Sequence, residues 1–122
     1  MATVPLNHFN RVSTTLGTTL TQVYSAPAST AAIMLTILAA NDTNIPQTIT
    51  VGISGNGGPN VATVPYYNLV KSFTIAPNDV TNLIVGKVVL MNYDAIYASC
   101  TNPNSVDLTL SILEALNTTT TT

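Results

Sequence analysis

Apolar and polar residues alternate with a period of two along much of this sequence, and this alternation restricts the chain to an all-β fold. In the clearest segment, 106–113, the apolar members are Val106, Leu108, Leu110 and Ile112. Successive side chains of a strand point to opposite faces, so the pattern predicts a strand with one face toward a core. Residues 48–54 and 67–75 repeat it. In the latter, Lys71 interrupts the apolar face, which predicts an edge strand.

Residues 31–41 differ because they are apolar on both sides. We expect a central strand buried on both faces, and a helix is the competing interpretation. Further strands are expected at 16–25, 80–85, 87–92 and 94–101. Turn residues (Pro, Gly, Asn and Asp) separate these segments. About eight strands with short connections predict an all-β fold, an antiparallel β-sandwich that is jelly-roll-like.

A chain of 122 residues has the length of one domain. We divide it into an N-terminal arm (1–15), a β-sandwich domain (16–117) and a disordered threonine tail (118–122). Leu6, Phe9 and Val12 recur at helical spacing, which allows a short turn of helix in the arm. Two alternatives are open for the arm: a strap that closes its own sandwich, or an extension to a partner subunit. The first twelve residues lack the pattern of a signal peptide, and no apolar stretch is long enough for a membrane helix.

Charge is scarce. Three basic and five acidic residues make up 7% of the chain, against about 25% in an ordinary soluble domain. Three scattered cations cannot neutralise a nucleic-acid backbone, so no nucleic-acid partner is expected. Threonine (21 residues) and asparagine (13) supply the polar surface instead. A protein with so little charge is either secreted and covered, or has much of its surface in contact with other protein. We favour the second interpretation.

Residues with the spacing of a catalytic, cofactor-binding or metal site are not found. The chain has one histidine, His8, and one cysteine, Cys100, which we expect to be a small buried hydrophobe. The acidic residues are spread over different turns and strands: Asp42, Asp79, Asp94, Asp107 and Glu114. A calcium site built from two loops is the disfavoured alternative. We therefore predict a protein that is not an enzyme and holds no cofactor and no metal.

Two adjacent tyrosines, Tyr66 and Tyr67, open a predicted strand and must point to opposite faces. An exposed tyrosine either anchors a protein interface or stacks on a sugar ring, and the lack of tryptophan favours the interface. The predicted partner-binding residues are Leu6, Phe9, Val12, Tyr66 and Tyr67.

Three stretches carry a resemblance to a known group of proteins: residues 23–30 with the following apolar strand and Asn41-Asp42, residues 84–90 with 94–98, and residues 106–114. In these the chain resembles small virion proteins of tailed bacteriophages, and among them capsid decoration (cement) proteins. It departs from them at Tyr93, where those proteins favour glycine.

The resemblance implies a non-enzymatic structural protein of the virion, made in the host cytoplasm. Its expected partners are other copies of itself, in a homotrimer, and the major capsid protein or another virion protein, with no membrane partner. The alternative is a tail or fibre accessory subunit with a carbohydrate-binding (adhesin) role.

Overall fold

The computed structural model describes residues 7–54 and 66–116, and these form nine strands and no helix. The strands are β1 (Asn7–Thr15), β2 (Thr21–Ser25), β3 (Thr30–Asn41), β4 (Gln47–Ser54), β5 (Tyr66–Ile75), β6 (Val80–Asn82), β7 (Val88–Leu90), β8 (Ala95–Cys100) and β9 (Val106–Leu116). Among these residues no helix is long and apolar enough to cross a membrane.

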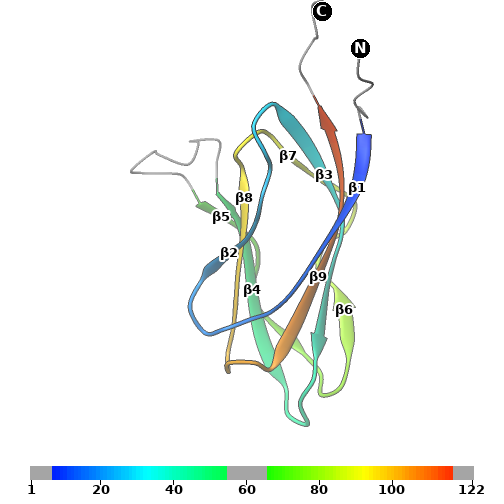
Figure 1. The fold of residues 1–122 in the computed structure, drawn as a ribbon. Helices are drawn as coiled ribbons and strands as arrows, with labels where there is room; N and C mark the ends of the chain where they lie inside the picture. The colour runs from blue at the N-terminus through cyan, green and yellow to red at the C-terminus, as the bar shows by residue number, and fades with distance from the viewer. Residues whose placement is uncertain (1–6, 55–65, 117–122) are drawn as a thin grey trace, which may run out of the picture.

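The strands form two antiparallel sheets that pack face to face (Figure 1). The first sheet has the order β1-β9-β3-β6, with β7 also paired to β3, and the second has the order β2-β8-β4-β5. The chain changes sheet at each of the first three connections, and each sheet interleaves strands from the two ends of the chain. This is the arrangement of a jelly roll, so the predicted antiparallel sandwich is confirmed.

The core lies between the sheets and is built from the apolar halves of the alternating strands. In β9, Leu108, Leu110 and Ile112 are buried, and their odd-numbered neighbours are not. β4 and β8 contribute Ile49, Val51, Ile96 and Ala98 from the other side, each at most 1% exposed. The period-two pattern thus follows from burial of one face of each strand.

Strand β3 is central in its sheet, as predicted, but the prediction that both its faces are buried is wrong for this chain. Ala32, Met34 and Ile37 face the core and are fully buried. On the opposite face Ile33 is half-buried and Leu38 is 38% exposed. Nothing in the described part of the chain packs over this outer face, so its apolar side chains stay accessible.

The N-terminal boundary also differs from the prediction. Residues 7–15, assigned to an arm, form β1, which pairs with β9 over nine consecutive residues from Asn7↔Ala115 to Thr15↔Asp107. The physical reason is that β9 has an open side, and an extended segment satisfies its backbone groups better than a helical turn. Residues 1–6 and the predicted tail 118–122 lie outside the described residues.

Strand β5 lies at the edge of the second sheet, as Lys71 predicted. Its pairing with β4 is shifted twice, and Ser72 has a positive φ of 51°. Such β-bulges insert extra residues, so the uniform alternation expected over 67–75 is not kept.

Candidate interaction surface

An apolar row crosses the outer face of the first sheet. The register pairs Phe9 with Leu113, Leu113 with Ile33, and Ile33 with Val89, so four strands place one apolar residue each in the same row. Phe9 is 77% exposed and Val89 is 59% exposed, whereas the two central residues are half-buried. Side chains directly opposite across strands contact one another, so this row is one continuous apolar strip.

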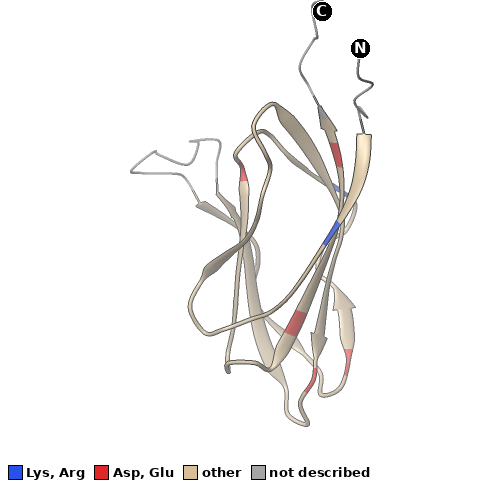
Figure 2. Ribbon diagram, viewed as in Figure 1, with Lys and Arg blue, Asp and Glu red and all other residues tan. Residues whose placement is uncertain are grey.

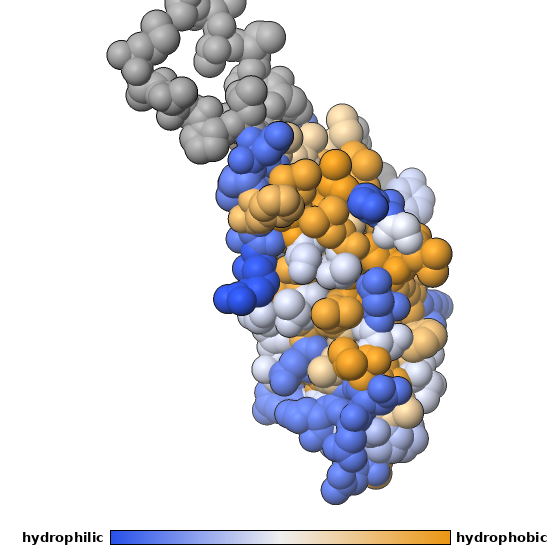
Figure 3. Space-filling view, turned by 90° about the vertical axis from the view of Figure 1, so that its right-hand side faces the viewer, coloured by the Kyte–Doolittle hydropathy of each residue, from blue (hydrophilic) through white to orange (hydrophobic). Residues whose placement is uncertain are grey.

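The strip is part of a wider apolar face. Space-filling shows apolar side chains gathered over the middle and upper part of this side of the molecule (Figure 3). Leu38 and Val80, further along the same sheet, are exposed as well. The charged residues of this outer face are few: Arg11 on β1 and Asp107 on β9 are exposed and two rows apart (Figure 2). A face of this composition loses little charge hydration when another surface covers it.

The outer face of the second sheet has a different character. Threonine hydroxyls accept from backbone groups of this sheet: Thr48 N–H donates to Thr101 Oγ1 at 2.8 Å, and Ser72 N–H donates to Thr50 Oγ1 at 3.0 Å. Many of the polar groups there are thus already satisfied within the chain, which leaves fewer free for a partner.

The two predicted tyrosines lie on opposite faces of β5, as expected. Tyr66 pairs with Ser54 and lies over Gly52, with its ring edge-on to that of Tyr97 at 6.4 Å. Burial raises the pKa of the Tyr66 hydroxyl. Tyr67 is 62% exposed and stands apart from this pair. The arrangement gives Tyr66 an internal packing role and leaves Tyr67 as a single exposed ring.

Of the remaining predicted partner-binding residues, Leu6 lies outside the described residues. Phe9 and Val12 are three positions apart on a strand, so they point to opposite faces: Phe9 outward, and Val12 inward against the core. A helical turn would have placed Phe9 and Val12 on one face, and the structure shows that this expectation is wrong. Phe9 instead joins Leu113, Ile33 and Val89.

A buried carboxylate that the sequence argument had not singled out joins the two sheets. Glu114, on β9, is 5% exposed and accepts a short hydrogen bond from the Tyr24 hydroxyl on β2. His8 Nε2 lies 2.8 Å from Glu114 Oε1, and Asn10 Nδ2 donates at 3.5 Å to Oε2, the oxygen that also accepts from Tyr24. The sequence signal that could have revealed this site is the position of Glu114. It lies two residues after Ile112 in β9, where the alternation predicts an inward-facing apolar residue.

Burial, with the hydrogen bond and negative charge of Glu114, raises the pKa of the Tyr24 hydroxyl well above its usual range. A phenol held neutral in this way is a stable donor and a poor proton-transfer group. The cluster of Glu114, Tyr24, His8 and Asn10 therefore links the two sheets, and we call it the Glu114 clasp.

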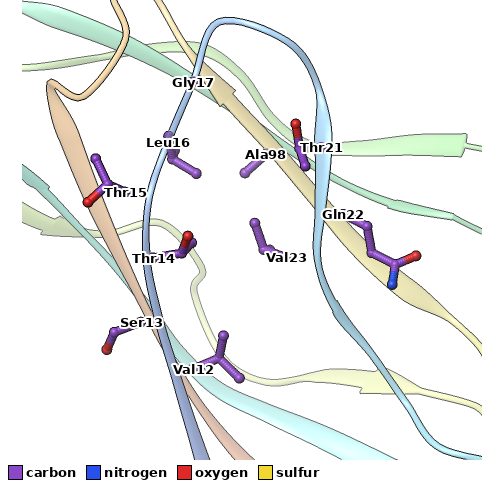
Figure 4. Close-up of a pocket in the computed structure, with 10 residues that line it drawn as sticks. All are labelled: Val12, Ser13, Thr14, Thr15, Leu16, Gly17, Thr21, Gln22, Val23 and Ala98. Atoms are coloured by element: carbon purple, nitrogen blue, oxygen red, sulfur yellow. The ribbon is translucent and has the colours of Figure 1, made fainter.

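A pocket of about 310 Å³ opens beside β1, where the two sheets separate (Figure 4). Residues 12–17 line one side, residues 21–23 the other, and Ala98 the floor. Its lining combines backbone edges, threonine hydroxyls and the side chains of Val12 and Val23. The pocket lies between β2 and this part of the edge of β1, so the two strands are separated there.

The acidic residues of the turns have backbone roles. Asp79 Oδ1 accepts from Val80 N–H at 2.8 Å, and Asp94 Oδ2 accepts from Met91 N–H at 2.9 Å. Cys100 is buried, as predicted, with its sulfur 2.9 Å from the Asn102 carbonyl oxygen. Among residues 7–54 and 66–116, no three His, Cys, Asp or Glu side chains come together as metal ligands would.

No protein-family model and no curated protein matches the chain. A search of solved structures finds a distant similarity to a chain described under the words "Bacillus endospore appendages form a novel family of disulfide-linked pili". The TM-score is 0.47 and the identity 14%, over 95% of this chain and 97% of that one. A likeness this distant carries no conclusion about the present protein.

Proposed function

We propose that this protein is a non-enzymatic structural subunit that self-associates within a larger protein assembly. The observation that carries the proposal is the apolar outer face of the first sheet, which the described part of the chain leaves uncovered. Leu38 and Val89 are 38% and 59% exposed there, although β3 has the composition of a strand buried on both sides. Exposed apolar surface of this extent marks a site of protein contact.

The energetics favour association over solitary existence. Full burial of an exposed large apolar side chain contributes roughly 1.5–3 kcal/mol. The strip offers two such positions per subunit, Phe9 and Val89, and two that are already half-buried. Only 8 of the 122 residues carry formal charge, so mutual repulsion between subunits is weak. Threonine and asparagine can bond to a neighbour without the desolvation of full charges.

The most specific form of this function is a capsid decoration (cement) subunit that oligomerises and braces a phage head. It is supported by the resemblance of residues 23–114 to such proteins and by the uncovered sheet. Its partners are other copies of itself and the major capsid protein or another virion protein, and its location is the virion. Modest contacts suffice in this setting because simultaneous attachment at several points multiplies their effect. Closed cyclic symmetry is expected, either a trimer or a two-fold dimer.

Sedimentation velocity of the full chain, from about 1 µM to 1 mM, tests the proposal. We expect concentration-dependent oligomers, and a dissociation constant at least about tenfold higher for the double variant Leu38→Thr/Val89→Thr. Phe73→Thr is the matched control, because Phe73 is 45% exposed on the second sheet. A wild-type chain that stays monomeric over the whole range overturns the proposal, and equal weakening by variant and control removes the first sheet from it.

A further inference from the structure

We propose that strand β1 pairs edge to edge, in antiparallel orientation, with β1 of a second copy of this chain. The inference rests on the proposed self-association and names the contact and its two-fold symmetry. Four features of the structure support it: the condition of the sheet edges, the free backbone groups of β1, the charges beside it and the opening next to it.

The edges of the two sheets are unequally protected. Free strand edges invite pairing with other chains, and proteins block them with bulges, short strands or lysines. β2 has a register shift, and β5 has two shifts and Lys71. β6 and β7 have three residues each. β1 is neither short nor bulged, since its nine residues pair with β9 without a shift, and Arg11 is its one lysine or arginine. Among the described strands it is the edge that remains open.

The backbone groups that β1 presents at this edge can be identified from its register. Leu16 N–H donates to the Val106 carbonyl at 2.9 Å and continues the pairing of β1 with β9. Residues of an antiparallel pair alternate between those bonded to the partner strand and those whose N–H and C=O point away. The even-numbered residues of β1 therefore bond to β9. The outward groups belong to the five odd-numbered residues, Asn7, Phe9, Arg11, Ser13 and Thr15.

The register that we propose pairs four of these five residues with one another. Centred on Val12, it pairs Arg11 with Ser13 of the partner subunit and Phe9 with Thr15 of the partner subunit. A register centred on Arg11 would place two guanidinium groups directly opposite each other, which is destabilising. A register centred on Asn10 also pairs four of the five, but it places Arg11 opposite Phe9 of the partner subunit, two rows further from Asp107 of the partner subunit. The contact is isologous, because each strand contributes the same surface.

The charges of the outer face fit this register. Within one chain Arg11 and Asp107 lie two rows apart, and no ion pair joins them among the described residues. Across the two-fold, Arg11 comes to roughly 12 Å, Cα to Cα, from Asp107 of the partner subunit, from the spacing of strands and rows. An extended arginine and an aspartate span that gap. Thr15 Oγ1 donates to Asp107 Oδ1 at 2.8 Å, which tilts the carboxylate toward the open edge.

The pocket between β1 and β2 keeps the edge accessible (Figure 4). Its volume of about 310 Å³ lies beside Ser13 and Thr15, where a paired strand would enter. In the other sheet, β2 diverges from β1 above the connecting turn (Figure 1).

The experiment measures the mass and dissociation constant of the full chain by sedimentation equilibrium. Ser13→Pro removes one outward N–H and leaves the bonds to β9 in place, so it should preserve the circular-dichroism spectrum and weaken the dimer at least about tenfold. Arg11→Glu and Asp107→Lys should each weaken it by a similar factor, and the double reversal should restore it to within about threefold. Lys71→Glu, the same charge change on β5, is the matched control and should have no effect.

The outcomes separate the two proposals. A monomer at every concentration overturns both. An oligomer of any size that Ser13→Pro and the charge reversals leave intact, including a trimer, overturns the β1 pairing and leaves the structural role standing. Single reversals that weaken the dimer without rescue in the double variant also overturn the register proposed here.

Discussion

Asn41 closes one end of the sandwich, and its replacement should be the most damaging single polar substitution in the chain. It is the last residue of β3 and 2% exposed. Its Nδ2 donates to the carbonyls of Ile45, Ile75 and Ala76 at 2.8, 3.1 and 3.2 Å. Its Oδ1 accepts from the Thr43 amide at 3.0 Å and the Thr43 hydroxyl at 2.7 Å. One side chain thus ties the β3–β4 turn to the end of β5.

The expected loss follows from what Asn41→Ala leaves behind. Two to three net hydrogen bonds disappear, at about 1 kcal/mol each. The buried Ile75 carbonyl also loses its hydrogen-bond donor, and this lowers the free energy of unfolding by about 1–3 kcal/mol more. The sum is roughly 3–6 kcal/mol, a large share of the 5–15 kcal/mol that typically stabilises a domain. Asn41→Asp keeps the shape but replaces the donor with an acceptor, so we expect at least the same loss at neutral pH.

Urea unfolding at fixed subunit concentration, followed by far-UV circular dichroism, measures this change from the shift in midpoint at constant slope. Asn44→Ala is the control: Asn44 belongs to the same turn and is exposed, and among the described residues its side chain has one hydrogen bond, in which Oδ1 accepts from Asn78 Nδ2 at 3.1 Å. It should cost less than about 0.5 kcal/mol. If Asn41→Ala lies within about 1 kcal/mol of the wild type, the assigned role of the amide is wrong.

Two further predictions concern tyrosine packing. The raised pKa of Tyr24 means that the folded chain keeps a proton that the unfolded chain releases above about pH 10, so stability should be full below that pH and fall by up to about 1.4 kcal/mol per unit above it. Tyr24→Phe, in urea unfolding at several alkaline pH values, should reduce this slope; an unchanged slope contradicts the burial beside Glu114. Gly52→Ala would drive a methyl group into the Tyr66 ring and should cost about 1–3 kcal/mol in the same assay, whereas Gly17→Ala meets no atom within 4 Å and should be near neutral. Equal stability of the two glycine variants would contradict the close approach.

Much of the fold could be predicted because most strands bury one face in a common core. Strands β4 and β9 agree with the predicted segments to within a few residues, since their inward positions are apolar. The order of strands within each sheet could not be predicted, because alternation defines a strand's faces and says nothing about its neighbours.

Strand β1 escaped prediction for a physical reason. Its inward positions include His8 and Asn10, which face Glu114, so the apolar alternation is absent. Its apolar residues, Phe9 and Val12, fall three apart and imitate a helix. The segment is extended because it completes the ladder of β9, about a hundred residues away in the chain, and no local pattern encodes that pairing.

The apolar strip was hidden in the same way. Ile33 and Leu113 each looked like ordinary members of apolar segments, and only the register shows that they share a row with Phe9 and Val89. The clasp on Glu114 likewise needs three strands from both sheets. Single-strand patterns therefore predict what is buried better than what is assembled at a surface.

The contrast between the two sheets explains why association should involve the first one. The second sheet satisfies outer hydroxyls internally, as Thr48 and Thr101 do, and its edge strands carry bulges. The first sheet has an apolar outer face and, in β1, an unblocked edge. Since bulges suppress edge contacts, their presence on both edge strands of the second sheet directs edge contacts to the first. Pairing at the edge of β1 would extend the first sheet, whereas a contact with its apolar outer face would cover it. The two contacts use different surfaces, so the first sheet can form both at once.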